Sequence, residues 1–196
     1  PLDYESESYR GLVESNPSVE AYYQAHDEAQ LDNLAQLGLK GLRNSVIADI
    51  GCGAGSFLDL VKGFSQMTIA VEPAKHFQEA LREKGHETYS YTEHALAKWE
   101  GKVDVVTCFA VLEHIEKPLE FISNIRKLLK PTGYLLLSTP NVDDWLIDFL
   151  PRVYDQFFFR YVHQWYFGAD SLKHLAELTG LTVGDISYKQ RFDLSN

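Results

Sequence analysis

The sequence has few cysteines, no long apolar run and a shortage of positive charge. Its only cysteines, Cys52 and Cys108, are too few for a disulfide framework and match no metal-ligand spacing. Reduced thiols are the rule in the cytosol. No stretch approaches the roughly 20 apolar residues of a membrane span, and the acidic start "PLDYESESYR" does not resemble a signal peptide. We therefore expect a cytoplasmic protein without a transmembrane segment.

The charge balance disfavours nucleic acid as a partner. The formal net charge is −10, with 28 acidic residues against 18 lysines and arginines. Because nucleic-acid binding depends on clustered Lys and Arg, no nucleic-acid partner is expected. The length of 196 residues suits one well-buried domain. We expect a polar N-terminal arm over residues 1–18, followed by a single domain over 19–196.

Strand-like and helix-like segments alternate along the chain. The strands are short, nearly continuous apolar runs such as "DVVTCF" and "YLLLST", as expected when both faces of a strand are buried. Such alternation predicts an α/β fold with a mainly parallel sheet and helices on both faces. Strands are expected over 45–50, 67–72, 86–91, 103–108, 134–139 and 181–188, and helices over 19–39, 55–63, 74–84, 94–98, 118–130 and 170–179.

The stretch "VIADIGCGAGSF" places three glycines directly after a predicted strand. Ligands of open α/β sheets bind at the carboxyl ends of the strands, and glycine leaves room for something to approach the main chain. A dinucleotide fingerprint would have a glycine where Ser56 stands, and no Lys-Ser or Lys-Thr follows as a phosphate-binding P-loop requires. The loop therefore favours a ligand other than a pyrophosphate.

A second acid supports a nucleoside ligand. Glu72 ends the predicted strand "TIAVE", 21 positions after Gly51, where a carboxylate typically accepts hydrogen bonds from ribose hydroxyls. Asp49 precedes the first glycine by two residues. The alternative for Glu72 is a solvated acid at a strand end. The two acids together with the glycines favour the nucleoside.

Four ordered motifs carry a family resemblance. The segments "ADIGCGAGSF", "AVEP", "TEHALAKWEGKVDVVTCFAVLEHIEKP" and "LLKPTGYLLLSTPN" resemble the class I S-adenosylmethionine-dependent methyltransferases. The likeness is nearest to the ubiquinone-pathway O-methyltransferases and their small-molecule relatives, and runs from about Ala21 to Leu181. It implies a Rossmann-like sheet that ends in an antiparallel hairpin. Only the first strand of that hairpin, 181–188, is evident, so a further C-terminal piece is expected.

The resemblance also implies a cofactor, a reaction and a binding set. S-adenosylmethionine would give its methyl group to a small-molecule acceptor and leave as S-adenosylhomocysteine. Asp49 would hold the loop and meet the methionine amino group, Glu72 would take the ribose hydroxyls, and Thr92 and Glu93 would lie beside the adenine. The implied cofactor-binding set is Asp49, Gly51, Cys52, Gly53, Gly55, Glu72, Pro73, Thr92, Glu93, Phe109 and Ala110.

Catalysis needs few groups in this chemistry. Methyl transfer from a sulfonium is an in-line displacement, so proximity and alignment supply much of the acceleration, and a base is needed only for a hydroxyl or an acidic carbon. The candidate catalytic residues are His163, His114 and Glu113. Alternatively, Glu113 and His114 cap the next helix and His163 is a packing residue. Some quinone-pathway relatives bind a divalent ion through an acid three residues earlier; Ala110 stands there, so no metal is expected.

The segment 142–168 is predicted to be an aromatic lid or an insertion at the acceptor pocket. The chain has 11 Phe, 11 Tyr and 3 Trp, and ten of these aromatics lie between Trp145 and Phe167. The segment would line the acceptor pocket, rest on a membrane surface as a peripheral contact, or pack against a second subunit in a homodimer. The candidate substrate-binding residues are Asp143, Asp144, Trp145 and Tyr166, although the aspartates could instead cap a helix.

The sequence is compatible with three functions. The first is a methyltransferase acting on an oxygen or nitrogen of a quinone, phenol, sugar or lipid-like molecule. The second is an NAD(P)-dependent oxidoreductase, which Ser56 counts against. The third is a non-catalytic module that retains cofactor binding. The sequence "CFAV" after the fourth strand lacks the Asn/Asp-Pro-Pro-aromatic signature of methyltransferases that act on nucleobase amino groups, which argues against a DNA target.

Overall fold

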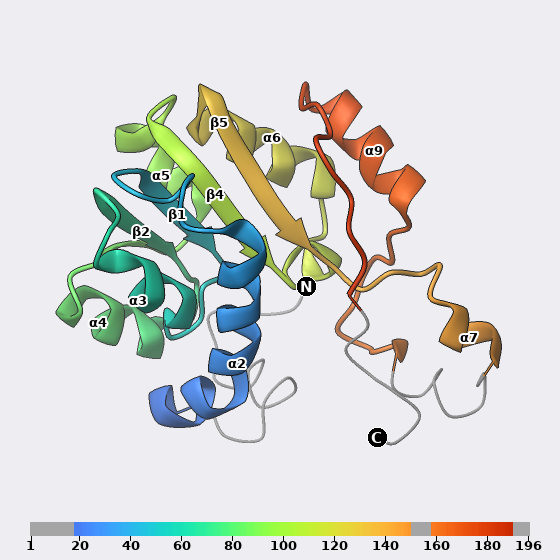
Figure 1. Cartoon of the computed structure of the whole chain (residues 1–196), viewed down its shortest axis with the longest axis horizontal. Helices are drawn as coiled ribbons and strands as arrows, with labels where there is room; N and C mark the ends of the chain where they lie inside the picture. Colours follow the sequence, from blue (N-terminus) through green and yellow to red (C-terminus); the bar gives the residue numbers. More distant parts are fainter. Residues whose placement is uncertain (1–17, 150–157, 190–196) are drawn as a thin grey trace.

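The computed structural model describes residues 18–149 and 158–189. Five parallel strands form one sheet in the order β3-β2-β1-β4-β5 (Figure 1). The order reverses between β1 and its neighbour β4, and ligands of such sheets bind at this switch point. The Rossmann-like α/β fold is confirmed. The strands are β1 (Val46–Ile50), β2 (Met67–Val71), β3 (Glu87–Tyr89), β4 (Val103–Phe109) and β5 (Leu129–Ser138).

Helices cover both faces of the sheet and enclose two cores (Figure 1). On one face lie α2 (Val19–Leu37), α3 (Ser56–Lys62) and α4 (Lys75–Glu83). On the other lie α5 (Thr92–Trp99), α6 (Pro118–Leu128) and α9 (Ala169–Leu178). The remaining described helices are the 3-10 turn η1 (Leu112–His114) and the short α7 (Trp145–Phe149).

Strand β1 is buried along its whole length because it lies between the two cores. Ile47 belongs to the core under α2, α3 and α4, while Ala48 and Ile50 belong to the core under α5 and α6. This burial on both faces explains why the strand is a continuous apolar run. Its rigid backbone delivers the glycine loop to the switch point.

The boundary between α6 and β5 differs from the prediction. The helix predicted over 118–130 and the strand predicted over 134–139 leave a short turn between them, but β5 already begins at Leu129. Val103 of β4 pairs with Leu129 and Val105 pairs with Tyr134, so the ladder contains an irregularity between them. Pro131 lacks an N–H and fits such an unpaired position. Pro118 stands in the first turn of α6, where its missing N–H costs nothing.

The predicted strand over 181–188 is wrong. Residues 181–189 contain no strand and enter none of the ladders of the described sheet. A strand is stabilised by pairing with a neighbour, and in the described part of the chain this segment pairs with no strand. Val183 and Tyr188 are accordingly exposed. The antiparallel strand implied by the resemblance is thus not found in the described residues.

Two predicted segments fall partly outside the description. Residues 1–17 of the expected N-terminal arm and residues 150–157 of the aromatic segment lie outside the described residues. Ser18 is described and begins the fold, because its hydroxyl accepts a hydrogen bond from the Ala21 N–H and caps α2. Among the described helices, none combines the length and apolar character that crossing a membrane requires.

Candidate functional site

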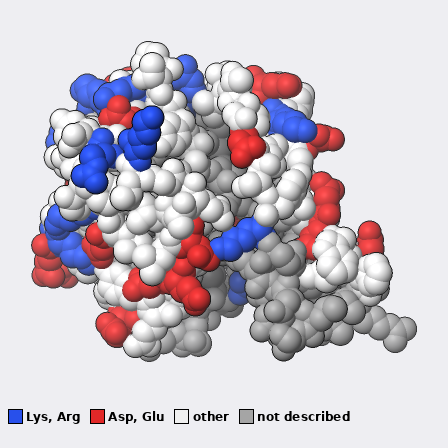
Figure 2. Space-filling view, viewed as in Figure 1, with Lys and Arg blue, Asp and Glu red and all other residues white. Residues whose placement is uncertain are grey.

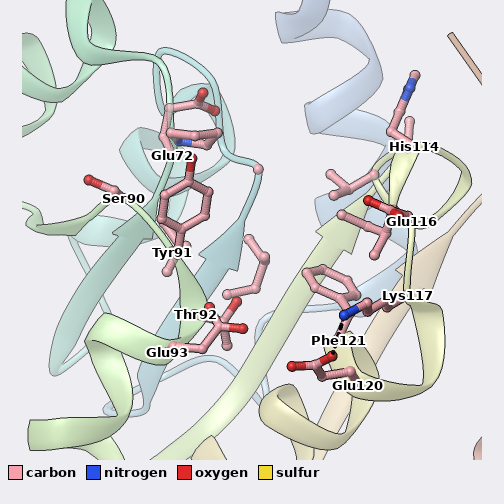
Figure 3. A pocket seen from close by; sticks show the side chains of 17 residues that line it. Glu72, Ser90, Tyr91, Thr92, Glu93, His114, Glu116, Lys117, Glu120 and Phe121 are labelled. Atoms are coloured by element: carbon pink, nitrogen blue, oxygen red, sulfur yellow. Dashed lines mark ion pairs between the residues drawn. The ribbon is translucent and has the colours of Figure 1, made fainter. Parts of the chain in front are cut away.

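A cavity of about 530 Å³ opens at the carboxyl ends of β1, β2 and β4. One wall carries Glu72 and the four residues 90–93 that follow β3, and the opposite wall carries His114 and the start of α6 (Figure 3). Its volume lies in the range of small-molecule sites, roughly 300–1,000 Å³. The lining consists of Ile50, Gly51, Val71, Glu72, Pro73, Ser90, Tyr91, Thr92, Glu93, Ala110, Val111, His114, Ile115, Glu116, Lys117, Glu120 and Phe121.

Glu72 is a buried, firmly held carboxylate. Its side chain follows β2 and the residue is only 1% exposed. The Gly53 N–H donates to Oε2 at 2.8 Å, and the Ala74 N–H donates to Oε1 at 2.9 Å. A carboxylate can accept about four hydrogen bonds, and Glu72 lines the cavity, where a ligand diol could donate to it. The burial excludes the solvated strand-end acid that the sequence left open.

Asp49 lies beneath the glycine loop and is 4% exposed. The Thr107 hydroxyl of the neighbouring strand β4 donates to Asp49 Oδ1 at 2.7 Å. Burial raises the pKa of Asp49 from its ordinary 3.8 to about 7; the Thr107 hydrogen bond opposes this rise and the charge of Glu72 adds to it. The site therefore concentrates acidic groups in a poorly solvated place, where a cationic ligand would be stabilised.

Two loop glycines are required by close contacts within the protein. At Gly51, with φ of +72°, a Cβ atom would lie 2.3 Å from Val111 Cγ2. At Gly53, with φ of +55°, a Cβ atom would lie 2.3 Å from the ring of Tyr22 on α2. Of the two, Gly51 lines the cavity. The bare backbone thus allows close packing against α2 at Gly53 and against Val111 at Gly51, where the loop also borders the cavity.

The predicted cofactor residues divide into two groups. Gly51, Glu72, Pro73, Thr92, Glu93 and Ala110 line the cavity. Asp49, Cys52, Gly53, Gly55 and Phe109 are not among the lining residues. The Phe109 ring meets the Phe57 ring edge to face at 5.5 Å, so its side chain contributes to the core between β4 and α3. Glu93 is held by the Asn124 amide of α6, which donates to its Oε1 at 2.8 Å.

Sequence reasoning missed residues on two walls of the cavity. Ser90 and Tyr91 directly follow β3, a position that could have indicated them because strand ends meet at one edge of the sheet. The first turn of α6 and the residues before it contribute Glu116, Lys117 and Glu120, and the Lys117 ammonium lies 3.8 Å from the Glu120 carboxylate (Figure 3). No sequence signal marked these three.

The three candidate catalytic residues come together in space. Donor atoms of Glu113, His114 and His163 all lie within 4.8 Å of one another. The His114 and His163 rings meet edge to face at 4.8 Å between centroids. Glu113 is 2% exposed and accepts a hydrogen bond from the Thr139 hydroxyl at 3.1 Å. Carboxylate and imidazole groups are ligands that divalent metals take. The sequence did not predict a metal site at these three residues.

The two histidines of this cluster are held differently. His114 Nδ1 lies 3.0 Å from the carbonyl of Val162, so Nδ1 carries the proton and donates. His163 Nδ1 is buried and has no hydrogen-bond partner in the described structure. Burial lowers the pKa of His163 to about 4, and the nearby His114 and Arg160 contribute to this lowering. His163 is therefore neutral at pH 7.

The candidate acceptor residues lie outside the cavity lining. Asp144 caps α7, because its Oδ1 accepts the Leu146 N–H at 3.0 Å. The Asp143 carboxylate packs against Gly168, where a Cβ atom would meet Oδ2 at 2.2 Å. Trp145 is 55% exposed, and the Tyr166 hydroxyl accepts the Arg160 N–H at 2.8 Å. Asp144 therefore caps a helix, which is the alternative that the sequence offered for the two aspartates.

A parallel sheet in this order, with a glycine loop at the switch point and a buried acid after the next strand, defines a nucleoside-binding Rossmann-like domain. The chain belongs to the methyltransferase-domain family, whose model, described as "Methyltransferase domain", matches residues 22–185. The resemblance to the class I S-adenosylmethionine-dependent methyltransferases is confirmed.

Individual relatives support the same family. The chain is 35% identical over 123 residues to the ubiquinone biosynthesis O-methyltransferase of Haemophilus ducreyi, covering 56% of this chain and 51% of that protein. The protein of the same name from Xanthomonas oryzae is 32% identical over 114 residues, covering 55% of this chain and 46% of its own length. The chain thus spans about half the length of the curated relatives it matches.

Solved structures show the same fold at low sequence identity. A SAM-dependent methyltransferase from Leishmania major superposes with a TM-score of 0.66 at 17% identity, covering 92% of this chain and 74% of that one. A SAM-dependent methyltransferase from Archaeoglobus fulgidus superposes with a TM-score of 0.63 at 23% identity, covering 82% and 72%.

Proposed function

We propose that the chain binds S-adenosylmethionine and transfers its methyl group to a small-molecule acceptor. The observation that carries the proposal is the cavity itself, which joins Gly51, the buried Glu72 and the wall that follows β4. Glu72 would accept hydrogen bonds from the ribose hydroxyls. Thr92 and Glu93 would lie beside the adenine, and Ala110 beside the methionine end.

The residues present fit this cofactor better than a dinucleotide. A pyrophosphate needs cationic or N–H donors, whereas Lys117 is the only lysine among the lining residues and has Glu120 3.8 Å away. The Gly53 N–H, which a phosphate would use, already donates to Glu72. The concentration of buried acids suits a ligand that carries ammonium and sulfonium charges.

The chain's own groups would act on the acceptor. When bound, the cofactor supplies the methyl group, and alignment of the acceptor in line with it provides much of the acceleration. We propose that His163 accepts the proton of an acceptor hydroxyl, while the neighbouring Glu113 and His114 hold its ring in place. The neutral state of His163 at pH 7 is required for this role.

The substitution His163→Ala distinguishes proton transfer by His163 from metal binding by Glu113, His114 and His163. His163→Ala should reduce methyl transfer to a hydroxyl acceptor by roughly 100-fold or more and leave S-adenosylhomocysteine affinity unchanged, because His163 does not line the cavity. Stoichiometric metal in the purified protein, lost in His163→Ala, would contradict the proton-transfer role.

The named relatives suggest the class of methyl acceptor. The ubiquinone biosynthesis O-methyltransferases support a quinone- or phenol-like acceptor, with sugars and lipids as further candidates. Phe149 and Tyr161, 75% and 93% exposed, support peripheral membrane contact or a homodimer through the aromatic segment. On the face shown in Figure 2, acidic and basic side chains are interspersed, which does not favour nucleic acid. Two buried free cysteines support a cytoplasmic location.

A thermal shift tests the cofactor assignment. At a ligand concentration 100-fold above its dissociation constant, S-adenosylhomocysteine should stabilise the chain by about 2.7 kcal/mol, which corresponds to roughly 5–10 °C for a chain of this size. NADH at the same concentration should give no shift. A shift with NADH and none with S-adenosylhomocysteine would support an oxidoreductase. Binding without turnover on a broad acceptor panel would favour a non-catalytic module.

A further inference from the structure

A charged network lies on the side of the glycine loop that faces α2 and α4. Lys84, between α4 and β3, donates from its Nζ to the carbonyl of Ala54 at 2.6 Å and to Asp59 Oδ2 at 2.9 Å. The same ammonium donates to the Tyr23 hydroxyl and lies 4.7 Å from the centre of the Tyr23 ring. One cation thus contacts the loop, α3 and α2 together.

The partners of Lys84 are themselves fixed. The Tyr23 hydroxyl of α2 lies 3.1 Å from the Ala54 carbonyl and 2.6 Å from Asp59 Oδ2. His86 Nε2 lies 2.9 Å from Asp59 Oδ1, and the His86 side chain is fully buried. The Asp59 carboxylate is therefore held from both oxygens, which leaves Lys84 in one arrangement against the loop.

The loop is held from two opposite sides at adjacent residues. On the cavity side, the Gly53 N–H donates a hydrogen bond to the carboxylate of Glu72. On the other side, the Ala54 carbonyl accepts a hydrogen bond from the Lys84 ammonium. Close packing continues at Gly55, where a Cβ atom would lie 2.6 Å from Leu81 Cδ2 and 3.8 Å from Lys84 Nζ. Without the hydrogen bond from Lys84 to the Ala54 carbonyl, one side of the loop that carries Gly51 would no longer be held.

We propose that Lys84 is a positioning residue for cofactor binding: its ammonium holds the glycine loop, through the Ala54 carbonyl, in the geometry that the cofactor contacts. The proposal rests on the proposed function, because it assumes that the cavity beside Gly51 takes S-adenosylmethionine. Lys84 and Ala54 do not line the cavity, so the effect passes through the loop. Tyr23 extends the same control to α2, whose docking then supports cofactor binding.

The chain provides a matched control at the other end of the sheet. Lys130 pairs with Asp104 at 2.7 Å, with side chains 38% and 29% exposed, against 27% and 34% for Lys84 and Asp59. Lys130 stands near the start of β5, at the amino ends of the strands and away from the cavity. Lys84→Met and Lys130→Met therefore remove similar ion pairs, and only the first touches the loop.

The test compares S-adenosylhomocysteine affinity by isothermal titration calorimetry with the melting temperature of the free protein. Lys84→Met should raise the dissociation constant about tenfold, equivalent to about 1.4 kcal/mol, and Lys84→Arg should restore it to within about threefold. Lys130→Met should lower the melting temperature by no more than Lys84→Met, which also loses the contacts with Ala54 and Tyr23, and it should leave affinity unchanged. Hydrogen exchange at the amides of residues 52–56 should quicken in Lys84→Met only.

Several outcomes would overturn the proposal. Wild-type affinity in Lys84→Met, or equal losses of affinity in Lys84→Met and Lys130→Met, would leave the lysine with a purely structural role. Should Lys84→Met fail to fold, Tyr23→Phe decides, because it removes the hydroxyl that contacts both Ala54 and Lys84 and should also weaken binding. If the unmodified chain does not bind S-adenosylhomocysteine, the proposed function fails, while exchange at residues 52–56 still reports on the positioning role.

Discussion

The substitution Asp49→Asn is expected to remove a loss of stability that the unmodified chain shows as the pH rises from about 4 to about 7. Burial raises the pKa of Asp49 from 3.8 to about 7, so the folded chain holds this proton more tightly than the unfolded chain does. Stability is therefore lost as pH rises from the unfolded pKa to the folded one. With about 1.4 kcal/mol for each unit of pKa, the part of this loss that falls between pH 5 and pH 9 is about 2–3 kcal/mol. Asparagine does not titrate and avoids it.

Urea unfolding of both proteins at pH 5 and pH 9, without ligand, measures this difference. The amide that the substitution introduces can still accept the Thr107 hydroxyl, and any penalty from its added NH2 group is the same at both pH values, so it cancels. The unfolding free energy of wild type should fall by about 2–3 kcal/mol more than that of D49N between the two pH values. Parallel pH profiles would refute a buried, raised-pKa carboxylate at position 49. At pH 9, where Asp49 is ionised, D49N should also weaken S-adenosylhomocysteine binding, since the negative charge is lost.

Two further substitutions test the loop. Glu72→Gln should weaken S-adenosylhomocysteine binding at least tenfold, because charge-assisted bonds are worth about 1.5–3 kcal/mol each; unchanged affinity by calorimetry would remove Glu72 from the site. It should also lower the unfolding free energy by about 1–3 kcal/mol, since its NH2 group would face the Gly53 or Ala74 N–H. Gly53→Ala should cost about 2–4 kcal/mol in urea unfolding, through its positive φ and the contact with Tyr22. Gly63→Ala, where a Cβ atom meets nothing within 4 Å, is the control, and equal effects at both glycines would contradict the packing account.

The sequence predicted the elements whose signals are local. Strand β1 and its loop follow from one apolar run and three glycines, and the spacing to Glu72 follows from the length of one helix and one strand. These features depend on burial on both faces of a parallel strand, which leaves a plain pattern in the sequence. The fold and the acid at the end of β2 were accordingly found without coordinates.

Side-chain direction and contacts across long separations could not be read from the sequence. Phe109 ends β4 and Ala110 follows it directly, yet the Phe109 ring packs into the core and Ala110 lines the cavity. His114 and the carbonyl of Val162 are 48 positions apart and still 3.0 Å from each other. The strand predicted over 181–188 failed because strand formation depends on a neighbouring strand, which a local apolar pattern does not reveal.

The most direct test of the account is a calorimetric titration of S-adenosylhomocysteine and, separately, NADH into the unmodified chain and Glu72→Gln. We expect saturable one-to-one binding of S-adenosylhomocysteine to the unmodified chain, at least tenfold weaker binding to Glu72→Gln, and no binding of NADH over the same range. Binding of NADH without S-adenosylhomocysteine, or S-adenosylhomocysteine binding that does not depend on Glu72, would contradict the assignment of the cavity.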